Sequence, residues 1–209
     1  MLLENRLLAT KSAKIAYLAG VTLLLTSLGC WVVLAHQDDG QMSPAAKAAM
    51  ADQGFAKEAA QGGMAEIKLG QLAQDKGSNE AVKSFGARMA TEHSKAGDHL
   101  KEAATKEHMA LPTELAAKDQ SLYDYLSKLS GVEFDRAYAE DMVKDHRQDL
   151  QAFQREARRG KDDLMRGFAS ETIPMIREHL NLAKEMHKAV SPTVTRSTSR
   201  HAGRPERGR

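Results

Sequence analysis

Three segments of the chain repeat the pattern Met-x-x-acid-His, at Met89–His93, Met142–His146 and Met175–His179. Around each segment the apolar residues recur every three or four positions, which is the spacing of an amphipathic helix. Because an α-helix turns once in about 3.6 residues, a Met and a His four positions apart share one face, with the acid beside that face. The repeat therefore predicts three helices that can bring three histidines together in one core.

The first long helix is expected to begin at Ser43-Pro44, where a capping residue precedes a proline at the first helical position, and to run to Lys76. Gly54 predicts an interruption within this helix. Glu66 shares its apolar stripe with residues such as Leu69. A carboxylate on a core-facing stripe needs a partner, so Glu66 is expected to have one in the core.

Three further long helices and one short helix are expected, and no segment of the sequence calls for a strand. Ser130-Gly-Val-Glu133 has the sequence of a capping box, which predicts the start of one long helix. The linkers are short enough for antiparallel neighbours except across residues 108–130. The sequence therefore predicts an all-α protein, an antiparallel four-helix bundle with a short crossover helix. The further helices are expected at about residues 80–107, 114–129, 130–160 and 161–189.

The N-terminal residues have the order of an export signal, since basic residues precede an apolar run from Ile15 to Ala35 and polar residues follow it. This order predicts an extracytoplasmic protein of the periplasm or cell envelope. Residues 1–35 are either a signal peptide cleaved after Ala35 or a retained N-terminal membrane anchor, because the run is long enough to span a bilayer of about 30 Å. In the second case the membrane is a partner. Cys30, the only cysteine, leaves a lipid-modified form open as well.

The charge is divided unevenly along the chain. Residues 1–35 carry +2 and the Arg-rich residues after Val190 carry +4, so the chain's total of +2 leaves −4 for residues 36–190. This mildly acidic domain gives no electrostatic case for binding nucleic acid. Residues 36–49 are expected to form a linker and residues 50–189 the bundle. Residues 190–209 are expected to form a disordered basic tail, because they contain almost no apolar residue.

Several segments resemble a known bacterial family. Gly63–Ala73, Gly131–Tyr138 and Ile173–Leu180, together with the three repeats, are similar to the family called domain of unknown function 4142. The resemblance covers roughly residues 50–188, in order and spacing. It implies a ferritin-like bundle in an exported protein, often assigned to the outer membrane, and it implies no established activity. The family's recurring positions carry over to Glu66, His93, His146 and His179, with Phe134, Asp135 and Tyr138 as a packing or polar cluster.

Ferritin-like di-iron centres take Glu from two helices and Glu-x-x-His from the other two. Ala90, Val143 and Ile176 stand where the second motif has its glutamates, so the ligand pattern argues against a di-iron centre. One Glu and three His from separate helices remain, and this set suits a mononuclear site for Zn, Cu or Fe. Alternatively, the four groups satisfy one another as a polar network without metal. The candidate metal ligands are Glu66, His93, His146 and His179.

The other residues of the repeat are expected to have lesser roles. The three methionines would suit Cu(I) if they faced the site, although Met at this spacing usually fills a core. The acids Glu92, Asp145 and Glu178 lie about 100° round the helix from their histidines, where they can bond to neighbouring helices or face water. Three histidines outside the repeat have no assigned role: His99, His108 and His187.

Two hypotheses of function follow from these residues. In the first, an extracytoplasmic bundle binds a transition metal or a small ligand through the Glu/His set, for metal handling or stress defence. In the second, the bundle is a non-enzymatic interaction module of the cell envelope, and its Glu/His set only fixes the register of the helices. The sequence favours a protein that is not an enzyme, because it has no nucleophilic triad and no phosphate-binding loop. Protein partners and oligomeric state are not indicated.

Overall fold

The computed structural model describes residues 42–191, and within them it contains helices and no strand. The predicted leader and nearly all of the predicted tail lie outside the described residues. No helix in the described range is both long and apolar enough to cross a membrane. The prediction of an all-helical protein is confirmed. The helices are α1 (Pro44–Lys76), α2 (Glu80–Lys106), α3 (Ala117–Leu126), α4 (Gly131–Arg159) and α5 (Asp163–Val190).

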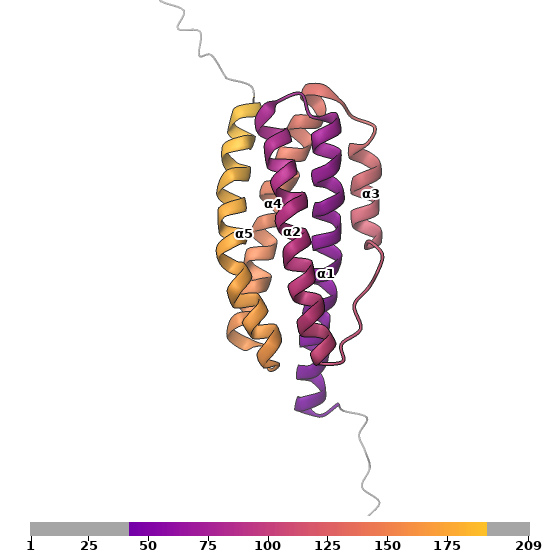
Figure 1. The fold of residues 1–209 in the computed structure, drawn as a ribbon, viewed down its shortest axis with the longest axis vertical. Coiled ribbons are helices and arrows are strands. Elements are labelled where there is room, and N and C mark those ends of the chain that lie inside the picture. The colour runs from indigo at the N-terminus through magenta and orange to yellow at the C-terminus, as the bar shows by residue number, and fades with distance from the viewer. Residues whose placement is uncertain (1–41, 192–209) are drawn as a thin grey trace, which may run out of the picture. The chain divides into compact units, whose positions relative to one another are not determined.

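The four long helices pack as two antiparallel hairpins, α1 with α2 and α4 with α5 (Figure 1). The hairpins meet where α2 packs on α5 and where α1 faces α4. The short helix α3 lies beside α1 and carries the chain from the end of α2 to the opposite end of the bundle, where α4 begins (Figure 1). Each long helix is therefore antiparallel to both of its neighbours, which makes the helical bundle with a crossover helix that the sequence predicts.

Two glycines bring the backbones of α1 and α2 into direct contact. A Cβ atom at Gly70 would lie 2.5 Å from the carbonyl oxygen of Gly86, and a Cβ atom at Gly86 would lie 2.6 Å from the carbonyl oxygen of Gly70. Real Cβ atoms do not approach an oxygen so closely, so neither position accepts a side chain without moving a helix. Glu66 lies one turn before Gly70, so the contact between the two glycines sets how close the side chain of Glu66 lies to α2.

The polar residues of the core lie between two apolar clusters. One cluster, towards the α1–α2 turn, includes Leu69, Met89 and Met142. The other, towards the α4–α5 turn, includes Leu100 and Phe153. Along α2, His93 falls between the first and second cluster, and along α4, His146 does the same. The site is therefore a polar layer with apolar packing on both sides.

Buried aspartates hold each hairpin turn against the other hairpin. Asp135 of α4 accepts hydrogen bonds from the amides of Ser78 and Asn79, at 3.0 and 2.9 Å, in the α1–α2 turn. Asp52 of α1 accepts hydrogen bonds from the amides of Lys161 and Asp162 in the α4–α5 turn, the shortest at 2.8 Å. These contacts lock the two hairpins in register. The resemblance left Asp135 as part of a packing or polar cluster, and the structure gives it this polar role.

Asp135→Ala is expected to destabilise the protein by about 2–4 kcal/mol, because two turn amides and the hydroxyl of Ser78 lose a charged acceptor. Urea unfolding of the two proteins measures the difference. The control is Glu140→Ala, an exposed carboxylate on the same helix, which should change the free energy of unfolding by less than about 0.5 kcal/mol. Equal effects of the two substitutions would contradict this role of Asp135.

Two local predictions are wrong. α1 runs without interruption through Gly54, because one glycine costs a helix only about 1 kcal/mol and the rest of this segment forms helix readily. Ser130 precedes α4 but its side chain makes no capping hydrogen bond. The next residue, Gly131, has a φ of 58°, so the chain enters the helix through a left-handed residue, whereas a capping box needs a helical residue at this position.

Candidate metal centre

The four predicted site residues meet at the centre of the bundle, and each comes from a different long helix. Glu66 lies on α1, His93 on α2, His146 on α4 and His179 on α5. Their exposed fractions are 1, 6, 0 and 0%. One ring nitrogen from each of the three histidines lies within 4.8 Å of the other two. The three histidines thus form one group, and Glu66 lies against two of them, His93 and His146, while metal binding by these residues stays a prediction.

The carboxylate of Glu66 points at two of the imidazoles. Its Oε2 atom lies 2.8 Å from Nε2 of His93, and its Oε1 atom lies 3.2 Å from Nε2 of His146. These pairs are close but are not aligned as hydrogen bonds: all four atoms are buried and have no hydrogen-bond partner among the residues that the structure describes. Polar atoms buried in this way need a partner, which a cation held between them would supply.

In two of the histidines, the ring nitrogen that does not face the candidate site makes a hydrogen bond that orients the ring. Nδ1 of His146 donates to the carbonyl oxygen of Met142 at 2.9 Å. Nε2 of His179 donates to Oε2 of Glu92 at 2.6 Å. A neutral imidazole carries one ring hydrogen, so Nε2 of His146 and Nδ1 of His179 are left with free lone pairs. Histidines that bind metals are typically held by such a bond to a carbonyl or carboxylate.

Burial sets the protonation states of these groups. It lowers the pKa of His93 and of His179 to about 4, and it lowers the pKa of His146. All three imidazoles are therefore neutral at pH 7, which is the form that binds metals. Burial raises the pKa of Glu66 to about 8, and the nearby His146 opposes this rise. Without a cation, Glu66 thus holds a proton at neutral pH.

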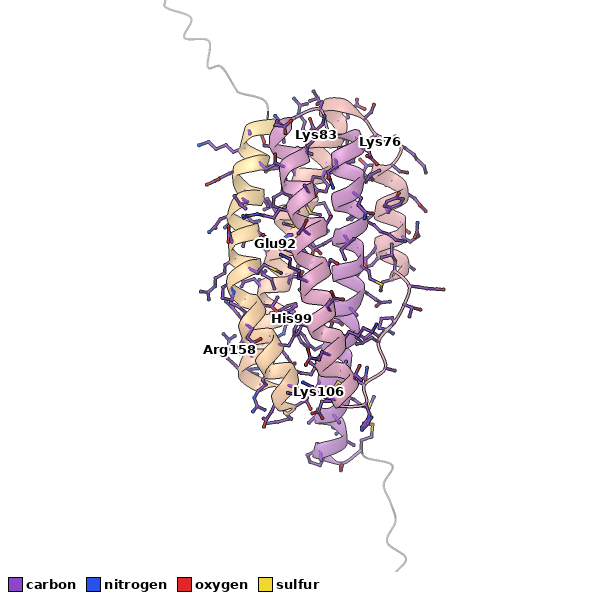
Figure 2. The ribbon with its side chains drawn as sticks, in the orientation of Figure 1. Lys76, Lys83, Glu92, His99, Lys106 and Arg158 are labelled. Carbon is purple, nitrogen blue, oxygen red and sulfur yellow. The ribbon has the colours of Figure 1, made fainter. Side chains whose placement is uncertain are left out.

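The acids of the repeat have three different environments. Glu92 is labelled on α2 in Figure 2. It accepts a hydrogen bond from His179 across the α2–α5 contact, and its Oε1 atom lies 3.4 Å from Nε of Arg88. Asp145 lies near Glu66 and His146, with one atom of each within 4.8 Å of the others. The side chain of Glu178 is 59% exposed. The expectation that the acids bond to neighbouring helices or face water therefore holds for Glu92 and Glu178, and the position of Asp145 beside the candidate site was not predicted.

Glu92 holds the ring of His179 in the candidate site, and the sequence did not predict this particular partner. Its position in the first copy of the pattern was visible, but its partner is on α5, and the contact depends on which helices are neighbours. The methionines at positions 89 and 142 pack in the apolar cluster near the α1–α2 turn. The three histidines without an assigned role are exposed, and they are His99, His108 and His187.

The metal-free protein is expected to lose stability as the pH rises from 6.5 to 8.5. The folded protein raises the pKa of Glu66 from 4.5 to about 8, so the stability that its proton contributes is complete below pH 4.5 and is lost as the pH rises through 8. Burial raises the pKa of Glu156 to about 7, which acts in the same direction. The histidines with lowered pKa act weakly in the opposite direction just above pH 6.5, because in the unfolded state they still lose protons there, and they are neutral in both states well above that pH.

Urea unfolding at pH 6.5 and 8.5 in the presence of a chelator measures this change. Glu66→Gln should make the decline smaller, since the amide does not titrate. A Glu66→Gln protein with the same decline as the unaltered chain would show that the carboxyl does not hold its proton in the folded state.

The fold and the site together define a helical-bundle protein with a buried cluster of three imidazoles and the carboxyl group of Glu66, beside which Asp145 lies. The chain belongs to the family described as Domain of unknown function (DUF4142), which matches residues 37–186. Searches of the curated proteins and of the solved structures found no match to this chain.

Proposed function

We propose that this bundle binds one divalent transition metal ion through Glu66, His93, His146 and His179. The observation that supports the proposal is the convergence of buried atoms with free lone pairs, none of which has a hydrogen-bond partner within residues 42–191. Three neutral imidazoles and one carboxylate form a donor set that Zn, Cu and Fe accept in proteins. The ion would also remove the cost of burying the carboxylate charge.

The donor set carries a preference among metals. Affinity for a site of nitrogen and oxygen ligands rises from Fe²⁺ to Cu²⁺ and falls again at Zn²⁺, so Cu²⁺ and Zn²⁺ should bind more tightly than Fe²⁺. We propose binding of the ion for metal handling or stress defence, and not a catalysed reaction. A mononuclear site fits the side chains better than a di-iron centre, because Ala90, Val143 and Ile176 offer no ligand.

The proposal is tested by adding Zn²⁺, Cu²⁺ and Fe²⁺ separately to the purified, metal-free protein. We expect one ion per chain and a rise in the thermal unfolding temperature, since a ligand that binds only the folded state stabilises it by mass action. The control ion is Mg²⁺, which prefers oxygen ligands and should change neither quantity. No bound ion and no thermal shift with any of the three metals would overturn the proposal.

Metal binding at pH 7 is expected to release about one proton per ion, because Glu66 has a pKa of about 8 and must lose its proton to become a ligand. The histidines are already neutral and release none. Affinity should therefore increase with pH up to about 8 and then level off. Calorimetry in two buffers of different ionisation enthalpy counts the protons. Release of no proton at pH 7, with the affinity independent of pH, would argue that the carboxylate is not a ligand.

The second candidate is an interaction module whose Glu/His cluster is a polar network. It is supported by the protonated state of Glu66, which could donate one hydrogen bond to Nε2 of His146 at 3.2 Å after a small rotation. In that case His146→Ala would lower the stability of the metal-free protein and no metal affinity would exist to lose. Unchanged stability together with loss of a measured affinity would exclude the network.

We further propose that the bundle is of the ferritin-like type and that it works outside the cytoplasm. The antiparallel order with a long crossover between α2 and α4 supports the first statement. The order of basic, apolar and polar residues at the N-terminus supports the second. The leader, whether cleaved or retained as an anchor, would then bring the domain to the periplasm or envelope. Fractionation of cells expressing the full chain tests this location, and recovery in the cytoplasm alone would contradict it.

A further inference from the structure

A cavity of about 620 Å³ lies beside the metal centre. It is bounded by α1, α2 and the connection from α2 to α3, and it extends to α4 and α5. Glu66 and His93 both line it, so the cavity reaches two of the four proposed metal ligands. Its volume is within the range of sites that bind small organic molecules.

The inner wall of the cavity is apolar. Leu100, Phe153, Phe168 and Ile176 line it, and each of them is buried. Gly63 of α1 also lines it, and a Cβ atom at this position would meet no atom within 4 Å. The cavity exists partly because this turn of α1 has no side chain to fill it.

The connection between α2 and α3 covers one side of the cavity. Met109, Leu111 and Pro112 of this connection belong to the lining. Glutamine side chains of α1 hold the connection in place: Nε2 of Gln53 donates to the carbonyl oxygen of Ala110 at 2.8 Å. The cover is therefore part of the fold, and it adds apolar surface to the cavity.

Few polar groups reach the interior of the cavity. The hydroxyl of Thr172 is already bonded to the carbonyl oxygen of Phe168. Burial raises the pKa of Asp149 well above its usual value, which favours the uncharged form of this carboxyl group. The charged side chains of the lining, such as Glu58 and Lys101, are exposed at the rim.

Glu66 and His93 remain as the interior groups whose polar atoms lack a partner within the described part of the chain. From this lining we infer that the cavity binds a neutral, largely apolar small molecule with one oxygen or nitrogen donor directed at the metal centre. The apolar walls would take the body of the molecule, and its donor atom would become a further ligand of the ion. The first part of this inference, the binding of an apolar molecule in the cavity, does not rest on the proposed metal site. The second part, the contact of its donor atom with the ion, does.

The test of the first part uses the neutral apolar dye N-phenyl-1-naphthylamine, which fluoresces when it leaves water. It is added to the full chain in the presence of a chelator. Gly63→Phe, which places a ring in the cavity, should weaken binding by about tenfold or more. Gly54→Phe is the matched control, because it lies on the same helix, lines neither this cavity nor its neighbour, and has equally open space around its Cβ position.

Both variants retain residues 1–41, so dye bound there contributes equally to all three proteins. Unchanged binding to Gly54→Phe with weak binding to Gly63→Phe supports the inference. Equal binding to the unaltered chain and to both variants overturns it, and so does failure of the unaltered chain to bind the dye.

The test of the second part loads the protein with Co²⁺ and adds 4-phenylimidazole, an apolar molecule with one nitrogen donor. A change in the visible absorption of Co²⁺ in the unaltered chain, absent from Gly63→Phe, is expected. Co²⁺ absorption that 4-phenylimidazole leaves unchanged overturns the contact with the metal. If the protein binds the dye but takes up none of Zn²⁺, Cu²⁺, Fe²⁺ and Co²⁺ when they are added without chelator, the apolar site stands and the proposed metal function has failed.

Discussion

His146→Ala is expected to weaken metal binding by more than about 100-fold, because even changes to residues that only orient metal ligands cost about 10–100-fold in affinity. His146 is fully buried, its Nδ1 atom is fixed by a carbonyl oxygen, and its Nε2 atom faces Glu66. Removal of the ring therefore leaves three ligands and a space on the α4 side. Titration of metal-free protein with Zn²⁺ measures the effect.

The matched control is His99→Ala, which removes an exposed imidazole from α2 and should leave the affinity unchanged. An intermediate result is expected for Glu92→Gln, since the amide can still accept the hydrogen bond of His179 but carries no charge to strengthen the ring as a ligand. If His146→Ala and His99→Ala bind Zn²⁺ equally well, the ion binds at the surface and the proposed site is wrong.

Gly86→Ala is expected to destabilise the protein by about 3 kcal/mol or more, since the methyl group must displace a helix backbone rather than a flexible side chain. The new Cβ atom would lie 2.6 Å from the carbonyl oxygen of Gly70 and 2.7 Å from the Cβ atom of Ala73. Separation of α1 from α2 would also move Glu66 away from His93. Urea unfolding and Zn²⁺ titration of one protein preparation measure the two consequences.

The control for this prediction is Gly97→Ala on the same helix. A Cβ atom at Gly97 would meet no atom within 4 Å, so the substitution should stabilise the protein by up to about 1 kcal/mol through helix propensity. A stable Gly86→Ala protein with full metal affinity would show that the two helices do not depend on backbone contact.

The spacing of residues predicted much of the fold and of the site. Each of the four nominated residues occupies the apolar stripe of its helix, and a helix of 3.6 residues per turn directs that stripe to the core. The chain has four long stripes with a short crossover helix, which left few arrangements other than a bundle. The convergence of Glu66, His93 and His146 followed from their similar places along those stripes.

Contacts between helices could not be read from the spacing. The bond from Glu92 to His179 requires α2 and α5 to be neighbours, which depends on how the two hairpins dock. The same holds for Asp145, which lies beside its stripe and still comes near Glu66. The Ser130 capping box was wrong for a local reason, because a positive φ at Gly131 changes how the chain enters α4.

Metal binding inside the bundle is tested most directly by a crystal structure of the protein soaked in Zn²⁺, with the ion located by its anomalous scattering. One strong peak is expected inside the bundle, at about 2.0–2.2 Å from a ring nitrogen of each of the three histidines and from a carboxylate oxygen of Glu66. Peaks at exposed histidines such as His99 alone, with Glu66 still in contact with His93 and His146 and no ion between them, would contradict it.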